Sequence, residues 1–178
     1  MKYYGICPAS CGEFVQGVMD RAEYLCSYAV DLYSTAEVEE KLNNINLGPL
    51  KSRKAIEAVF KKFNIPVEES KNISLKIRSK IPVGKGMASS TADIGATIGA
   101  TLGLIKKELS SEEIAKLAST IEPTDSIYIE KNSIFNPLNG EVIRYLGNVK
   151  DLRVVILEPN STLNTMRIRK TPNSNFLF

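Results

Sequence analysis

Apolar and polar positions alternate with a period of two over several stretches of this 178-residue chain, which is typical of half-buried strands. The clearest alternation covers residues 73–79. The first forty residues are also strand-like, and we predict a turn at residues 17–20 between two long arms. Asn139 and Gly140 stand between two short apolar stretches, which predicts a hairpin. A nearly continuous apolar run at residues 152–157 predicts a central strand.

Two other stretches carry apolar residues at spacings of three and four, the period of an amphipathic helix. Residues 50–63 predict one helix, with Lys51, Lys54, Lys61 and Lys62 as its solvated surface. The buried face of that helix would hold Ala55, Ile56, Val59, Phe60 and Phe63. A second helix begins at a capping box, Ser110 with Glu113, and we expect Pro123 to end it.

A third helix is predicted over residues 92–105, where small residues dominate. Gly95, Gly99 and Gly103 recur at four-residue spacing, and each internal glycine costs about 1 kcal/mol of helix propensity relative to alanine. We therefore expect the backbone of another element to pack closely against this stripe. With no internal repeat and no obvious linker, the pattern predicts one compact α+β unit with a central buried helix.

Composition narrows the chemistry that this unit can perform. With 23 basic and 20 acidic residues the net charge is +3, which implies no strong attraction to nucleic acid. No apolar stretch reaches membrane-spanning length. The chain contains no histidine, which excludes a Ser-His triad and histidine-ligated zinc. The odd set Cys7, Cys11 and Cys26 favours reduced thiols in a cytoplasmic protein.

A glycine-rich loop joins the strand at residues 73–79 to the small-residue helix. Glycines let the backbone adopt positive φ, and the first amides of a helix attract anions, above all phosphate. The loop is not a Walker loop, because Lys85 precedes Gly86, nor a dinucleotide fingerprint, because Ser89 replaces the third glycine. A purely structural turn with one serine as helix cap is the alternative. The predicted nucleotide-binding residues are Pro82, Val83, Gly84, Lys85, Gly86, Met87, Ala88, Ser89, Ser90 and Thr91.

These residues resemble the phosphate-binding motif of the GHMP kinases, Pro-x-Gly-x-Gly-Leu-x-Ser-Ser-Ala, with Met87 in place of leucine and Thr91 in place of alanine. Motifs at residues 8–17 and 122–125 resemble one branch, the L-threonine kinases of cobalamin synthesis. The resemblance implies an α+β, ribosomal-protein-S5-like amino-terminal lobe. It also implies ATP and Mg²⁺ as cofactors and an amino-acid hydroxyl as acceptor, first that of L-threonine and second that of homoserine.

The resemblance also assigns roles to individual residues. Ser90 and Glu122 match the family's magnesium ligands, and Asp125 matches its catalytic or substrate-orienting aspartate. Acidic groups are unfavourable near a helix carboxyl end, so a cation close by would explain Glu122 and Asp125 better than solvent alone. Asp93 would suit the helix dipole in the first turn, and contact with a substrate amine or a metal is the alternative reading.

An acceptor site is implied near the amino terminus, where alternation along a strand would place Cys11 and Glu13 on one face. Cys11 equally suits a small buried position. The residues that the resemblance assigns to this site are Ser10, Cys11, Gly12, Glu13 and Gln16.

The resemblance ends near residue 168, so we expect residues 1–168 to form the ATP-binding lobe and residues 169–178 a divergent tail without the family's second lobe. Two alternatives to an active kinase follow. The lobe could bind nucleotide without turnover, or it could need self-association or a complementing carboxyl-terminal lobe. An RNA-binding module is a third alternative, because S5-like lobes occur in ribosomal proteins, and the near-neutral charge disfavours it.

Overall fold

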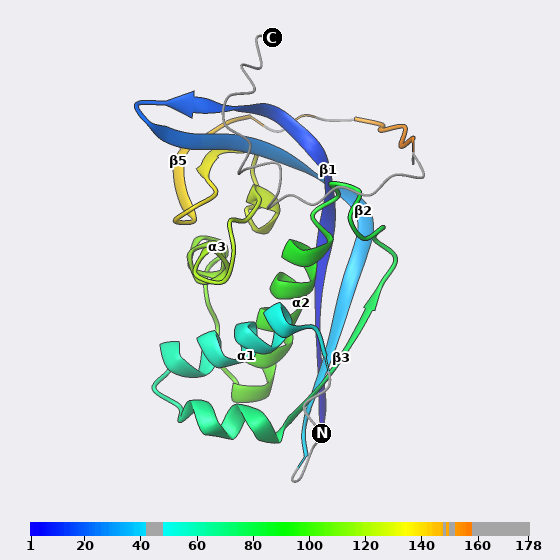
Figure 1. Ribbon diagram of the computed structural model, residues 1–178, viewed down its shortest axis with the longest axis vertical. Coiled ribbons are helices and arrows are strands. Elements are labelled where there is room, and N and C mark those ends of the chain that lie inside the picture. The colour runs from blue at the N-terminus through cyan, green and yellow to red at the C-terminus, as the bar shows by residue number, and fades with distance from the viewer. Residues whose placement is uncertain (42–47, 148, 150–151, 158–178) are drawn as a thin grey trace.

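The computed structural model describes residues 1–41, 48–147, 149 and 152–157, and these residues form the predicted α+β unit. The strands are β1 (Lys2–Met19), β2 (Ala22–Glu40), β3 (Ile73–Ser79), β4 (Ser133–Asn136) and β5 (Glu141–Tyr145). The α-helices are α1 (Leu50–Lys62), α2 (Ser89–Ile105) and α3 (Ser111–Ser119), and the 3₁₀ helices are η1 (Val67–Asn72) and η2 (Ser126–Tyr128). Figure 1 shows their arrangement.

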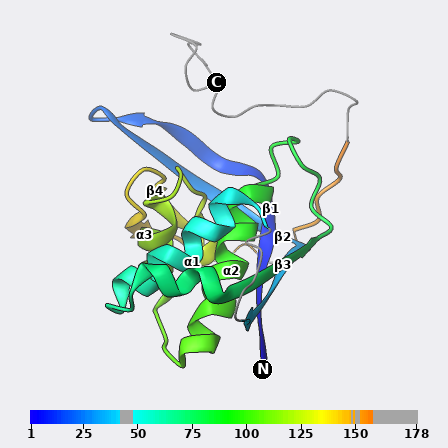
Figure 2. The ribbon, with the colours of Figure 1, turned by 60° about the horizontal axis from the view of Figure 1, so that its bottom comes forward.

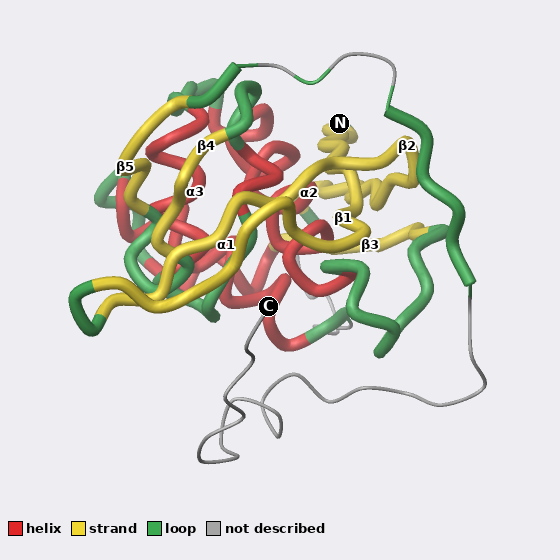
Figure 3. The backbone as a smooth tube through the Cα atoms, turned by 90° about the horizontal axis from the view of Figure 1, so that it is seen from above, coloured by secondary structure: helices red, strands yellow, loops and turns green. Residues whose placement is uncertain are grey.

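Strand β2 is the centre of a five-stranded antiparallel sheet. It pairs with β1 along most of its length, with β3 at residues 34–40 and with β4 at Leu25. The hairpin turn lies at Asp20 and Arg21, whose φ values of 51° and 65° suit a tight two-residue turn. The predicted turn at residues 17–20 is therefore misplaced, because Gly17 pairs with Tyr24 inside the ladder. The hairpin tip projects from the body of the molecule (Figures 1 and 3).

Helix α2 lies between the sheet and the other two α-helices (Figure 2). Its alanine ridge faces β1 and β2, where Ala92, Ala96 and Ala100 join Ala36 and Val38 in the largest buried cluster. Its larger side chains face α1 and α3; this second cluster holds Ala55, Val59, Ile94, Ile98, Leu102 and Ala118. The expectation of a central helix buried on most sides is confirmed.

The glycine stripe of α2 meets three different neighbours. A Cβ built at Gly99 would lie 3.7 Å from the Cα of Gly5 on β1, so the backbones of the two elements approach closely there. At Gly95 the space is taken by Tyr128 and by the Sγ of Cys7, and at Gly103 by Tyr3. The predicted close backbone contact is thus confirmed at one position of three, and side chains fill the other two.

Helix α3 begins with the predicted capping box. The Ser110 hydroxyl accepts from the Glu113 amide, and the Glu113 carboxylate accepts from the Ser110 amide at 3.0 Å. We expect Ser110→Ala to destabilise the protein by about 1 kcal/mol, because one amide donor of the first turn loses its acceptor. Urea unfolding followed by circular dichroism measures this loss. Ser119→Ala, which removes a hydroxyl at the other end of α3, is the control, and an equal loss there would contradict the capping role.

Two expectations about elements need correction, and a third is confirmed. Residues 152–157 form no strand, and Val155 and Leu157 are each 86% exposed. An apolar run becomes a central strand only where two strands offer it free edges, and composition alone does not supply those edges. Helix α3 ends at Ser119, four residues before Pro123, so the proline follows the helix end rather than causing it. The Asn139–Gly140 hairpin between β4 and β5 is confirmed, with Gly140 at φ 72°.

Within the described part of the chain, no helix is long and apolar enough to cross a membrane.

Candidate active site

The glycine-rich loop leaves β3 and is anchored in the core at both ends. Ile81 and Met87 are each only 4% exposed, whereas Val83 between them is 80% exposed. Gly84 and Gly86 have φ values of 69° and 73°, a region in which a side chain would be strained. The loop backbone is therefore held in one shape while its middle faces outward. Met87 serves as an apolar anchor of the loop.

Helix α2 begins at Ser89 without a side-chain cap. Its N-cap residue is Ala88, in a left-handed conformation with φ 54°, and alanine offers no oxygen to the first-turn amides. The alternative in which a serine caps this helix is therefore wrong, because both serines lie inside the helix. The first amides of a helix have no intrahelical acceptor, and the helix dipole makes this end positive. A bound anion would supply the hydrogen-bond acceptors that no capping side chain provides for these amides.

Three segments meet beside this helix end. The Ser90 hydroxyl on α2 donates to Glu122 Oε1 at 2.6 Å, and the ammonium of Lys51 on α1 pairs with Glu122 Oε2. Glu122, which follows α3, has a side chain only 15% exposed. Lys51 is thus a cation beside Glu122 in this structure, and the magnesium ion expected there stays a prediction. The predicted lysine surface of α1 is exposed, and two of its members also form ion pairs, Lys51 with Glu122 and Lys62 with Glu113 at 3.3 Å.

Asp125 lies on the inner side of the same helix end. The Thr91 hydroxyl donates to Asp125 Oδ2 at 3.4 Å, so the buried Thr91 side chain turns inward rather than toward the loop surface. The Tyr128 hydroxyl donates to the Thr91 carbonyl at 2.7 Å and accepts from Thr124 at 3.3 Å. Burial raises the pKa of Tyr128, which therefore remains a hydrogen-bond donor. These contacts fix Asp125 relative to α2.

Asp93 is the fifth residue of α2, so it lies beyond the first turn and the dipole explanation for it is weaker than expected. It accepts a hydrogen bond from Ser34 on β2. Burial raises the pKa of Asp93, the charge of Glu122 adds to this, and the Ser34 hydrogen bond acts in the opposite direction. Asp93, Glu122 and Asp125 thus place acidic groups around one helix end.

The raised pKa of Asp93 predicts a pH dependence of stability. A carboxyl whose folded pKa lies above its unfolded pKa stabilises the fold below the unfolded value, and this contribution is lost as the pH rises through the folded value. We expect Asp93→Asn to melt at a higher temperature than the wild type near neutral pH. The difference should shrink as the pH is lowered into the acid range. Thermal melts from neutral to acid pH test this, and a difference independent of pH would contradict it.

Known proteins that are similar to this chain are kinases. The family profile described as the GHMP kinases N terminal domain matches residues 51–129, which include the loop, Ser90, Glu122 and Asp125. The L-threonine kinase of Salmonella typhimurium is 39% identical over 171 residues, which is 96% of this chain and 57% of that protein. The L-threonine kinase of Citrobacter freundii is 35% identical, covering 96% of this chain and 59% of that protein.

This chain is therefore similar to members of the GHMP kinase family.

A solved structure supports the fold of this chain. A crystal structure of mevalonate kinase superposes with a TM-score of 0.60 and 27% identity, covering 81% of this chain and 56% of that one. The prediction of a GHMP-type α+β lobe is confirmed. The chain spans less than two thirds of the length of the curated relatives that it matches, 57% and 59%.

The expected acceptor-site residues lie on and beyond a bulge in β1. The ladder register shifts between Ser10 and Glu13, and Gly12 has φ 122°. The buried Ser10 hydroxyl bonds to both the amide and the carbonyl of Gly12, so it holds the bulge together. The shift breaks the alternation that was to place Cys11 and Glu13 on one face: Cys11 packs against the core, and Glu13 is exposed.

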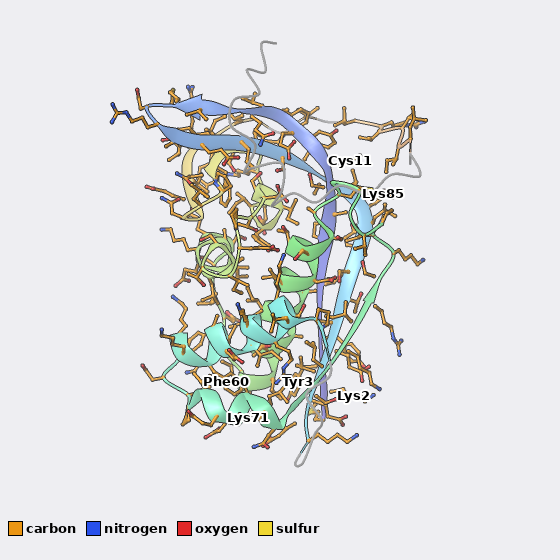
Figure 4. All side chains as sticks on the ribbon, viewed as in Figure 1. Lys2, Tyr3, Cys11, Phe60, Lys71 and Lys85 are labelled. Carbon is orange, nitrogen blue, oxygen red and sulfur yellow. The ribbon has the colours of Figure 1, made fainter. Side chains whose placement is uncertain are left out.

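Gln16 lies farther along the hairpin and donates to Glu23 at 3.3 Å. Cys11 and Lys85 lie at the same end of the molecule (Figure 4), and Cys11 packs against the same buried cluster as Ala88. The bulge and the glycine loop therefore lie toward the same end of the molecule (Figure 4). The roles of Ser10, Cys11, Gly12, Glu13 and Gln16 in binding an acceptor remain predictions.

All three cysteines are free thiols, as the odd count led us to expect. Burial raises the pKa of Cys7 to about 12, so this thiol stays protonated. Its sulfur lies where a side chain at position 95 would sit. Cys7 is a packing residue of the β1–α2 contact.

The residues present fit a magnesium ion that arrives with a nucleotide. Ser90 and Glu122 place two oxygen donors 2.6 Å apart at the positive end of α2. Among the described residues, no group of three or more acidic, cysteine or histidine side chains could hold a metal by itself. Magnesium usually takes one or two carboxylates and completes its shell with phosphate and water oxygens, so this small donor set suits the ion when it is bound to phosphate.

Sequence reasoning missed three residues of this site. Lys51 could have been found, because a basic side chain in the first turn of a helix opposes the dipole and so calls for an acidic partner. Tyr128 and Ser34 carry no such signal, since their contacts with Thr91 and Asp93 come from segments far apart in the sequence.

Proposed function

We propose that this chain is the ATP-binding lobe of a kinase that phosphorylates the side-chain hydroxyl of L-threonine. The product would be O-phospho-L-threonine, used in cobalamin synthesis. The similarity to two L-threonine kinases over 96% of the chain supports the choice of acceptor. Homoserine kinase activity is the alternative, because homoserine is also a hydroxyl amino acid.

One observation supports phosphoryl transfer most directly. The uncapped start of α2 lies between a loop with two glycines at positive φ and a Ser90–Glu122 pair 2.6 Å apart. Amides, the helix dipole and two oxygen ligands thus converge where a triphosphate and its metal would bind. Phosphoryl transfer depends mainly on positioning and on neutralising charge, and these features supply both.

We assign the following roles to residues of the chain. Backbone amides of residues 86–90 would bind phosphate oxygens, and Ser90 and Glu122 would hold Mg²⁺. The metal supplies charge neutralisation on the phosphates when it is bound. Asp125 would accept a hydrogen bond from the threonine hydroxyl and orient it toward the γ-phosphorus. The new bond joins the threonine oxygen to phosphorus, the bond from phosphorus to the bridging oxygen breaks, and Asp125 takes the hydroxyl proton.

The test is ADP release by the purified chain with Mg·ATP and a panel of acceptors. We expect turnover with L-threonine and little with L-homoserine or L-serine. A chain that prefers homoserine would contradict the acceptor assignment and keep the kinase assignment.

Nucleotide binding without turnover would favour the alternative in which the lobe needs a complementing carboxyl-terminal lobe. The coverage of only 57% of the Salmonella relative is the observation behind this alternative. Isothermal titration with an ATP analogue distinguishes this case from a chain that binds no nucleotide, and the latter result would contradict the proposed function altogether.

A further inference from the structure

The ion pair between Lys51 and Glu122 is unusual in its placement. Lys51 is the second residue of α1, and the first turn of that helix contains no acidic residue. A positive charge at a helix amino end is unfavourable, and Pro49, the N-cap residue, makes no side-chain cap bond. The lysine is held there by Glu122, whose other carboxylate oxygen accepts the hydrogen bond from Ser90.

The two partners differ in how freely they can move. The Glu122 side chain is 15% exposed and is tied to Ser90, whereas the Lys51 side chain is 48% exposed. The carboxylate is therefore fixed at the site. The ammonium, at the end of a flexible stem, can leave toward solvent or toward an incoming anion.

We propose that Lys51 is a positioning residue that occupies the metal ligand Glu122 in the nucleotide-free chain and excludes a lone divalent cation. This inference rests on the proposed function, because it takes Glu122 as a metal ligand. A free dication would have to displace the Lys51 ammonium from the Glu122 carboxylate. It would then remain close to the positive charge of that ammonium. A metal–nucleotide complex brings phosphates, which attract the released ammonium. Lys51 thus makes metal binding depend on nucleotide.

The direct test is a titration of the nucleotide-free chain with Mn²⁺, a stand-in for Mg²⁺ that electron paramagnetic resonance detects. We expect Lys51→Met, which keeps the apolar stem and removes the charge, to bind Mn²⁺ roughly tenfold more tightly than the wild type. Lys51→Arg should resemble the wild type. With an ATP analogue present, the wild type should gain Mn²⁺ affinity, and Lys51→Met should gain much less.

Lys54→Met is the matched control, because Lys54 is an exposed lysine of the same helix that makes no ion pair among the described residues. It should leave Mn²⁺ binding unchanged. The double variant Lys51→Met, Glu122→Gln should lose the increase in Mn²⁺ affinity that Lys51→Met alone produces. Circular dichroism checks the fold of each variant, and Lys51→Gln replaces Lys51→Met if the latter does not fold.

The outcomes separate this inference from the proposed function. If Lys51→Met binds Mn²⁺ no more tightly than the wild type while Glu122→Gln still weakens binding of the metal–nucleotide complex, the role of Lys51 is wrong and the metal site stands. If Glu122→Gln has no effect on either measurement, the metal assignment itself is contradicted, and the inference about Lys51 is overturned with it.

Discussion

Ser90→Ala and Glu122→Gln should each lower threonine-dependent ADP release at least about 100-fold, the loss typical when one preorganised electrostatic contact to a transition state is removed. Each substitution deletes one of the two oxygen donors that lie 2.6 Å apart beside the start of α2. Both residues are only partly buried, so the melting temperature should change little. Steady-state kinetics at saturating threonine, with Mg²⁺ varied, measures the effect.

The matched control is Glu108→Gln, which neutralises an exposed glutamate beyond the carboxyl end of α2. It should retain wild-type turnover. Full activity in both Ser90→Ala and Glu122→Gln would show that the metal site lies elsewhere. A loss in all three variants would point to a general effect of surface charge or of handling.

The second large effect concerns stability. We expect Gly5→Ala to destabilise the fold by about 3 kcal/mol or more, at the upper end of the roughly 1–3 kcal/mol typical of an overpacked core. A Cβ at Gly5 would overlap the carbonyl oxygen of Ala96 and the amide nitrogen of Ala100. Both are backbone atoms of α2, which cannot rotate away. Because α2 carries the proposed phosphate site, the variant should also bind nucleotide more weakly. Urea unfolding measures the change in the free energy of unfolding.

Two glycine variants make this prediction specific. Gly17 lies on the same strand, and a Cβ added there would meet nothing within 4 Å, so Gly17→Ala should change stability little. Gly99→Ala would place its Cβ at an ordinary 3.7 Å from Gly5 Cα, and we expect it to be neutral or to stabilise by up to about 1 kcal/mol. A Gly5→Ala protein as stable as Gly17→Ala would contradict the close packing of β1 on α2.

The elements of this fold were predictable where local chemistry determines them. The capping box at Ser110 satisfies backbone donors within one turn, and the apolar face of α1 follows from spacing alone. The positive-φ glycines of the loop also follow from local rules, whereas α2 begins at Ser89, three residues before the predicted start. The pairing of Ser90 with Glu122 was expected only through resemblance, because the two residues lie on separate segments.

Contacts between distant segments determined the rest. The bulge at Gly12 shifts the register of β1 and defeats an argument based on simple alternation. Arg53 of α1 is buried because its guanidinium donates to the carbonyls of Ser70 and Ile73, and no pattern in the sequence indicates this. The apolar pattern of residues 152–157 does not show whether a neighbouring strand is available, and these residues pair with no strand of the described sheet.

The central claim is that the uncapped amides at the start of α2 bind the phosphates of a nucleotide. Amide chemical-shift mapping by ¹H–¹⁵N NMR, with Mg²⁺ and a non-hydrolysable ATP analogue added to the chain, tests it most directly. We expect the largest shifts at Gly84, Gly86 and residues 88–91, with smaller shifts near Glu122. Saturable shifts confined to another region, with the amides of residues 84–91 unchanged, would contradict the claim.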